Sequence, residues 1–122
     1  MNNIFSENTI CAIATGSVTS AIAIIRVSGN EAIQIANTIF SKDLKNTKSH
    51  TVIYGNILDG ENIIDEVLLS IFKNNKSFTG EESVEISCHG SIYIQNKIMQ
   101  LLIKNGCRTA TEGEFTMRAF KN

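Results

Sequence analysis

The stretch AIAIIRVSGNEAIQIANTIF, residues 21–40, decides the fold because the spacing of its apolar residues changes halfway along. Its first half, Ala21–Gly29, is rich in isoleucine and valine, which is typical of a strand. In its second half, apolar residues recur every three or four positions, which predicts a helix with Ser28 or Asn30 as its N-cap. The residues at helical spacing are Ala32, Ile35, Ala36 and Ile39.

The segments on both sides of this stretch continue the mixture of strands and helices. An Asp-Gly pair at residues 59–60 predicts a β-hairpin, and an Asn-Gly pair at residues 105–106 ends a second helical pattern. The further strands are expected in Thr9–Thr15, twice in His50–Lys73, in Val84–Gly90 and in Cys107–Thr111, and the further helices in Ser91–Gly106 and Gly113–Asn122.

This order of elements contains no repeated βαβ unit. We therefore expect an α+β fold with a mixed, mainly antiparallel sheet and about three helices packed on it. A chain of 122 residues has the size of one domain, so residues 1–122 are expected to share one core.

The last expected helix, GEFTMRAFKN at residues 113–122, has an apolar stripe at Phe115, Ala119 and Phe120. This stripe predicts an amphipathic helix. Arg118 follows Glu114 by one turn, so an ion pair within the helix is a structural interpretation of both residues.

Composition limits the classes of function. The net charge is -1 and no cluster of lysine and arginine forms a basic stripe, so little nucleic-acid affinity is expected. The apolar run AIAIIRV is too short to span a bilayer, and the start of the chain lacks a signal peptide pattern. We therefore expect a cytoplasmic protein with no membrane association.

Three cysteines, Cys11, Cys88 and Cys107, lie in apolar or strand-like segments and include no CxxC pair. Such cysteines are usually small buried side chains in a reducing compartment. Zinc needs about four converging ligands, and His50 and His89 are scattered, so no metal site is expected.

Arg26 is the first candidate for a functional residue, because it shares one face of its expected strand with Ile22 and Ile24. A partly desolvated guanidinium needs an anion. One interpretation is an arginine at a sheet edge that reaches water or pairs with a neighbouring carboxylate. The other is a clamp for an anionic or polar ligand.

Glu85 is the second candidate. In ESVEISCHG, residues 82–90, Glu85, Ser87 and His89 share a polar face. This face is either the solvated side of an antiparallel sheet or the wall of a pocket. In a pocket, the two oxygens of Glu85 suit a heterocycle that presents paired N–H groups.

Nucleophilic catalysis and nucleotide binding are poorly supported by the sequence. Ser87 and His89 share a strand face, but the sequence shows no acid to orient the histidine. Neither GxxxxGK[ST] nor GxGxxG occurs, so these residues form no phosphate loop. No catalytic residue is therefore assigned.

Three motifs in order, IIRVSG (24–29), SFTGEESVEISCHG (77–90) and GEFTMRAFKN (113–122), resemble the N-terminal domain of the MnmE (TrmE) family of tRNA-modification GTPases. The resemblance covers essentially the entire chain. It implies a tetrahydrofolate-binding, dimer-forming domain similar in fold to the folate-binding domain of glycine-cleavage aminomethyltransferases. It also implies that a helical domain and a GTPase domain follow in a longer protein.

The resemblance assigns Arg26 and Glu85 as folate-binding residues, and places a third contact on a lysine just beyond Asn122. The implied ligand is 5-formyl- or 5,10-methylene-tetrahydrofolate, and GTP, Mg²⁺ and K⁺ would belong to the longer protein only. Implied partners are a second copy of the chain, the flavoprotein MnmG (GidA) and tRNA. The implied reaction adds an aminomethyl-type group at C5 of the wobble uridine.

Four short departures from the family pattern leave an alternative open. The chain has ATGSVTS at residues 14–20 in place of a loop rich in proline and glycine, and NKSFTGE, HGS and TEGEF in place of PxSFTGE, HGG and RPGEF. None changes Arg26 or Glu85. The alternative function is a dimerisation scaffold whose folate pocket has degenerated.

Overall fold

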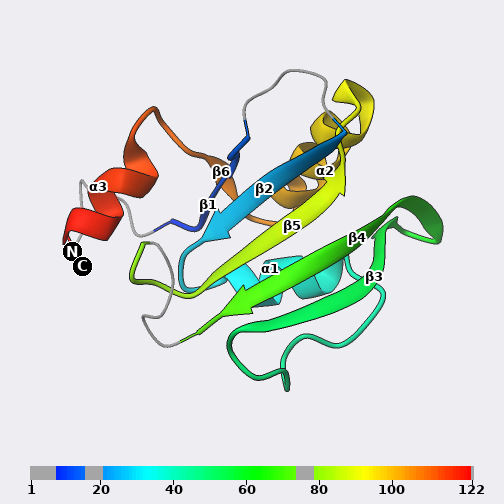
Figure 1. Cartoon of the computed structure of the whole chain (residues 1–122), viewed down its shortest axis with the longest axis horizontal. Coiled ribbons are helices and arrows are strands. Elements are labelled where there is room, and N and C mark those ends of the chain that lie inside the picture. Colours follow the sequence, from blue (N-terminus) through cyan, green and yellow to red (C-terminus); the bar gives the residue numbers. More distant parts are fainter. Residues whose placement is uncertain (1–7, 16–20, 74–78, 122) are drawn as a thin grey trace.

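The computed structural model describes residues 8–15, 21–73 and 79–121. Within them the expected elements occur in the expected order (Figure 1). The strands are β1 (Ile10–Ile13), β2 (Ile22–Ser28), β3 (Thr51–Asp59), β4 (Asn62–Phe72), β5 (Ser83–His89) and β6 (Arg108–Thr109). The helices are α1 (Ala32–Thr38), α2 (Ile92–Lys104) and α3 (Glu114–Lys121).

The strands form one six-stranded sheet in the order β3-β4-β5-β2-β1-β6. Neighbouring strands are antiparallel except for β1 and β6, which run parallel. The prediction of an α+β fold with a mixed, mainly antiparallel sheet and three helices is therefore confirmed. Among the described residues, no helix is long and apolar enough to cross a membrane.

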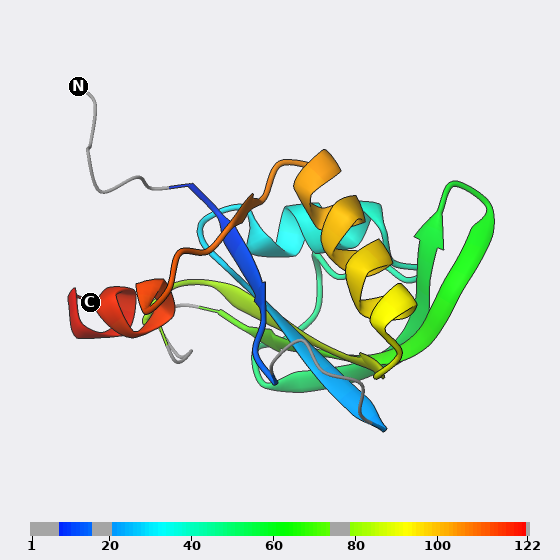
Figure 2. The ribbon, with the colours of Figure 1, turned by 90° about the horizontal axis from the view of Figure 1, so that it is seen from above.

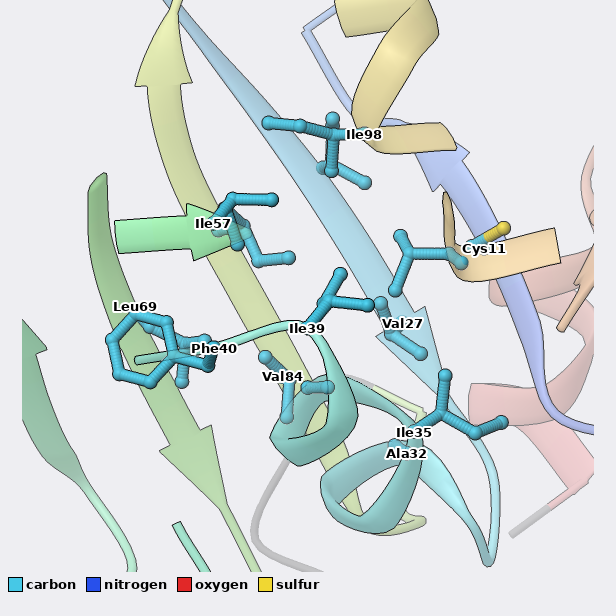
Figure 3. Packing of buried hydrophobic residues seen from close by; sticks show 14 of the residues in the cluster. Cys11, Val27, Ala32, Ile35, Ile39, Phe40, Ile57, Leu69, Val84 and Ile98 are labelled. Carbon is cyan, nitrogen blue, oxygen red and sulfur yellow. The ribbon is translucent and has the colours of Figure 1, made fainter. Parts of the chain in front are cut away.

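The main core lies on one side of the sheet, which we call the inner face. Figure 2 shows α1 and α2 on this side, with α3 apart from them at the end where the C-terminus lies. Inward side chains of β2 and β5, such as Ile25 and Ile86, are fully buried, as are Ile98 and Leu102 of α2. Figure 3 shows side chains from the α1 region and α2 gathered against those of the central strands.

The hairpin between β3 and β4 turns at Gly60 and Glu61, since Asp59 pairs with Asn62. Gly60 has a φ of 62°, a conformation that glycine adopts without steric cost. The predicted hairpin is confirmed, but its two turn residues are Gly60 and Glu61 rather than Asp59 and Gly60, because Asp59 still belongs to β3.

The predicted cap of α1 was wrong. The helix begins after Glu31, whose own side chain forms no capping hydrogen bond. The first amides are instead satisfied from elsewhere in the fold: Glu31 N donates to Thr9 Oγ1 at 3.1 Å and Ile33 N donates to Glu82 Oε1 at 3.4 Å. Side chains distant in sequence thus replace the local cap.

The helix expected at residues 113–122 is present as α3, but its apolar stripe is covered only in part, since Phe115 and Ala119 are half-buried. Phe120 is 94% exposed, whereas the buried residues of this helix are Glu114 and Arg118. Charged side chains can be buried when each has partners of opposite charge, and both have them here. Ion pairs therefore help to attach the helix, in addition to its half-buried residues Phe115 and Ala119.

Candidate functional site

Arg26 and Glu85 lie directly opposite each other on the neighbouring strands β2 and β5. Arg26 Nε donates to Glu85 Oε2 at 2.9 Å, and the two side chains are 25% and 27% exposed. The strand alternation directs both away from the buried Ile25 and Ile86, onto the face opposite α1 and α2. We call this the outer face.

The first interpretation of Arg26, an edge arginine that pairs with a neighbouring carboxylate, is correct only in its second part. The arginine pairs with a neighbouring carboxylate, but β2 lies inside the sheet between β5 and β1, so its expected place at an edge was wrong. Among the described residues, no hydrogen bond reaches Oε1 of Glu85. That oxygen remains available to accept an N–H group from a ligand.

Phe115 of α3 lies beside Arg26 on the outer face. Its ring centroid lies 5.6 Å from Cζ of Arg26, within the range of a cation–π contact. The guanidinium is therefore held between a carboxylate and an aromatic ring. The sequence identified Phe115 only as an apolar residue of a helix, because nothing local indicates that α3 lies beside β2.

A buried polar network lies next to the Arg26–Glu85 pair and joins α3 to β2. Arg118 donates to both carboxylate oxygens of Glu81, at 3.0 and 3.3 Å, and to the Asn8 carbonyl at 2.8 Å. The Ser28 hydroxyl of β2 donates to Glu81 Oε1 at 2.9 Å and also hydrogen-bonds with Thr79. In the sequence, Glu81 is marked only by its place in the SFTGEESVEISCHG motif, in the loop before β5.

Glu114 links α3 to β6. It accepts hydrogen bonds from both terminal nitrogens of Arg108, at 3.1 and 2.6 Å, and from the Thr111 amide at 2.9 Å. It also contacts Arg118 Nη2 at 3.3 Å, which confirms the predicted pair within the helix. The hydrogen bonds from Arg108, more than any other contact, lower the pKa of Glu114 from its ordinary value of 4.5 to about 2.

A shallow, mostly apolar pocket of about 280 Å³ opens at the other end of the outer face. Its rim includes Ser87 and His89, and Asp65 orients the histidine: His89 Nδ1 lies 2.6 Å from Asp65 Oδ1. The expectation that no acid orients His89 was therefore wrong. The pocket is lined by Ile22, Tyr54, Glu66, Val67, Leu68, Ser87, Cys88 and His89.

The outer face presents charged and hydrogen-bonding side chains, such as Arg26, Glu85 and His89. Among the described residues, no hydrogen bond joins Ser87 to His89, and Cys88 is buried in the core away from the histidine. No group of three His, Cys, Asp or Glu side chains in the described ranges could hold a metal ion. The GSVTS departure, at residues 16–20, lies outside the described residues.

Comparisons with known proteins agree with the resemblance seen in the sequence. The family profile described as "GTP-binding protein TrmE N-terminus" matches residues 9–122. The chain is 56% identical over 120 residues to the tRNA modification GTPase MnmE of Flavobacterium psychrophilum, covering 95% of this chain and 26% of that protein. It is 54% identical over 122 residues to the protein of the same name from Bacteroides thetaiotaomicron, covering 96% of this chain and 26% of that protein.

The chain thus spans about a quarter of the length of these curated relatives. The family match covers nearly every residue that the structure describes, including the Arg26–Glu85 pair and the whole of α3. From these matches, the chain belongs to the TrmE N-terminal family.

Proposed function

We propose that this chain is a single folate-binding and dimerisation domain, and that it holds 5-formyl- or 5,10-methylene-tetrahydrofolate on the outer face of its sheet. The observation that carries the proposal is the partly exposed Arg26–Glu85 pair on adjacent strands. Both residues are the ones that the family resemblance assigns to folate.

The hydrogen-bonding groups of a pterin match this pair. Glu85 would accept the ring N–H and 2-amino groups of the pterin through its two oxygens, and Arg26 would donate to a carbonyl or carboxylate of the same ligand. Phe115 beside Arg26 supplies an aromatic surface for a ring system. The bound folate would supply the one-carbon unit, while these residues would bind and orient it.

The longer protein would use this unit to build an aminomethyl-type group at C5 of the wobble uridine of tRNA. In this proposal the flavoprotein MnmG is the partner, and GTP hydrolysis with Mg²⁺ and K⁺ belongs to the part of the protein that follows this chain. The reaction would take place in the cytoplasm, where tRNA is available.

Dimerisation is supported by the apolar character of the outer face. Four large apolar side chains on β2, β3 and β4 are between 49% and 62% exposed, and clustered exposure of this kind is typical of an interaction surface. They are Ile22, Val52, Tyr54 and Leu68. The same observation favours the second candidate function, a dimerisation scaffold with a degenerate folate pocket.

Calorimetric titration with 5-formyl-tetrahydrofolate tests the proposal. The 122-residue chain is titrated beside a form extended by about a dozen residues, long enough for roughly three further helical turns that include the expected lysine. We expect Glu85→Ala to weaken binding at least tenfold, and Glu61→Ala, which removes an exposed carboxylate at the hairpin turn, to leave it unchanged.

Unchanged affinity in Glu85→Ala would overturn the site assignment. A dimer that shows no folate binding in either form would favour the scaffold function instead.

A further inference from the structure

The two buried residues of helix α3, Glu114 and Arg118, are both charged. An isolated helix of eight residues is not stable in water, so its position depends on its tertiary contacts. Arg118 provides the contacts nearest to the ligand site, because its partner Glu81 is also bonded to Ser28 of β2.

Ser28 follows Arg26 by two residues in β2, so the two side chains lie on the same face of the strand, about 7 Å apart along it. The Arg118–Glu81–Ser28 network therefore fixes α3 immediately beside Arg26. Phe115 lies one turn before Arg118 in the helix, on the side where its ring contacts the Arg26 guanidinium.

We propose that Arg118 is a positioning residue for the folate site, acting through Phe115, which forms an aromatic wall of that site. This inference rests on the proposed folate-binding function and adds two residues to it. Arg118 does not contact the ligand in this proposal. It holds the helix that places Phe115 against Arg26.

The guanidinium of Arg118 suits this role better than any other side chain. Its fixed, planar set of N–H donors reaches Glu81, Glu114 and the Asn8 carbonyl at the same time. A lysine ammonium is a single point of charge and would not span the three acceptors with the same geometry. Arg118→Lys therefore keeps the charge but loosens the helix.

A loosened helix would affect the ligand site in two ways. The Arg26 guanidinium would lose the ring that limits its orientation, and water would reach the Arg26–Glu85 pair more freely. Both changes weaken hydrogen bonds to a ligand, because such bonds are stronger in a fixed and partly dehydrated site.

A double-mutant cycle on the dissociation constant for 5-formyl-tetrahydrofolate tests the inference, with the variants Phe115→Leu, Arg118→Lys and the double variant. The cycle uses the 122-residue chain, or the extended form if only that form binds. We expect each single variant to bind about tenfold more weakly, consistent with the loss of one ring contact. The double variant should bind no more weakly than Phe115→Leu alone, since Arg118 acts through Phe115.

Control variants separate positioning from loss of folding. Lys97→Met removes a remote ion pair with Asp59 and should leave affinity unchanged. Circular dichroism and thermal melting report whether each variant is folded. If Arg118→Lys unfolds the chain, Glu81→Gln takes its place in the cycle, because it weakens the same contact from the other side.

The possible results distinguish the failure of this inference from failure of the function. Wild-type binding that is lost in Glu85→Ala but unchanged in Arg118→Lys and Phe115→Leu overturns the inference and keeps the folate site. Effects that multiply in the double variant also overturn it, because they indicate independent roles. Absence of wild-type binding in both forms overturns the folate function and this inference with it.

Discussion

The buried carboxylate of Glu114 makes the stability of the protein depend on pH. Its pKa is lowered to about 2, first by the hydrogen bonds from Arg108, and the charged form is therefore favoured by folding. A lowered folded-state pKa stabilises the protein at pH values above the ordinary pKa of 4.5, and this contribution is lost as the pH falls toward 2. Because Arg108 is about one-third exposed, solvent screening reduces the effect.

We predict that Glu114→Gln removes this acid-sensitive part of the stability. The wild-type free energy of unfolding should fall by about 2 kcal/mol more than that of the variant between about pH 5 and pH 2. Urea unfolding followed across this range measures the difference. Glu112→Gln, at an exposed neighbouring position, is the control and should follow the wild-type curve. Parallel curves for wild type and Glu114→Gln would contradict the prediction.

The cysteines give a second prediction at the residue scale. Cys11, Cys88 and Cys107 are all free and buried, and burial raises the pKa of the Cys88 thiol to about 11. A hydrogen bond from Cys107 lowers the pKa of Cys11, but all three thiols are shielded by burial. Native protein at pH 8 should therefore react slowly with a thiol reagent such as Ellman's reagent, and denatured protein should react at once. Rapid labelling of one or more thiols in the native protein would show that a cysteine is accessible.

At the scale of elements, β3 and the segment after α1 meet at Gly55. A Cβ atom at this position would lie only 2.4 Å from Cζ of Phe40, whose ring is buried against the sheet. The missing side chain of Gly55 therefore makes room for the phenylalanine. This close approach joins the edge of the sheet to the layer that contains α1.

We predict that Gly55→Ala lowers the free energy of unfolding by about 1 to 3 kcal/mol, because the Phe40 ring must move within a packed core. Thermal or urea unfolding measures this loss. A smaller side chain at position 40 should relieve the clash, so Gly55→Ala should cost less in a Phe40→Leu background than in wild type. Equal costs in both backgrounds would show that the ring is not the cause.

At the scale of the whole molecule, the two faces of the sheet differ in what covers them. Helices α1 and α2 cover the inner face, and α3 lies at one end (Figure 2). The apolar side chains on the outer face of β3 and β4 are exposed. Leu68 lies within this exposed group, opposite Tyr54 on β3 and Ser87 on β5. This arrangement makes the outer face the surface proposed for dimerisation.

We predict that Leu68→Glu shifts the chain from dimer to monomer, because a charge within an apolar interface is costly to dehydrate. Sedimentation velocity over a range of concentrations measures the shift. Ile103→Glu is the matched control, since Ile103 has similar exposure but lies on α2 on the inner side of the sheet. A dimer that survives Leu68→Glu would place the interface elsewhere.

The order of elements and the fold class were determined by sequence alone, because each element carries its own local signal. Alternating β-branched residues marked the strands, Gly60 marked the hairpin and Gly106 ended α2. Strand alternation also predicted that Glu85, Ser87 and His89 share one face of β5. Each of these signals depends on only a few neighbouring residues, so it can be recognised in the sequence without knowledge of the fold.

Only the tertiary structure decided which distant residues meet. It brought Glu85 opposite Arg26, Phe115 onto the guanidinium, and Asp65 onto His89. It also buried two charged residues of α3, Glu114 and Arg118, while leaving Phe120 of the expected apolar stripe exposed. Burial of a charge depends on partners supplied by other segments, and no local pattern of residues records where those partners lie.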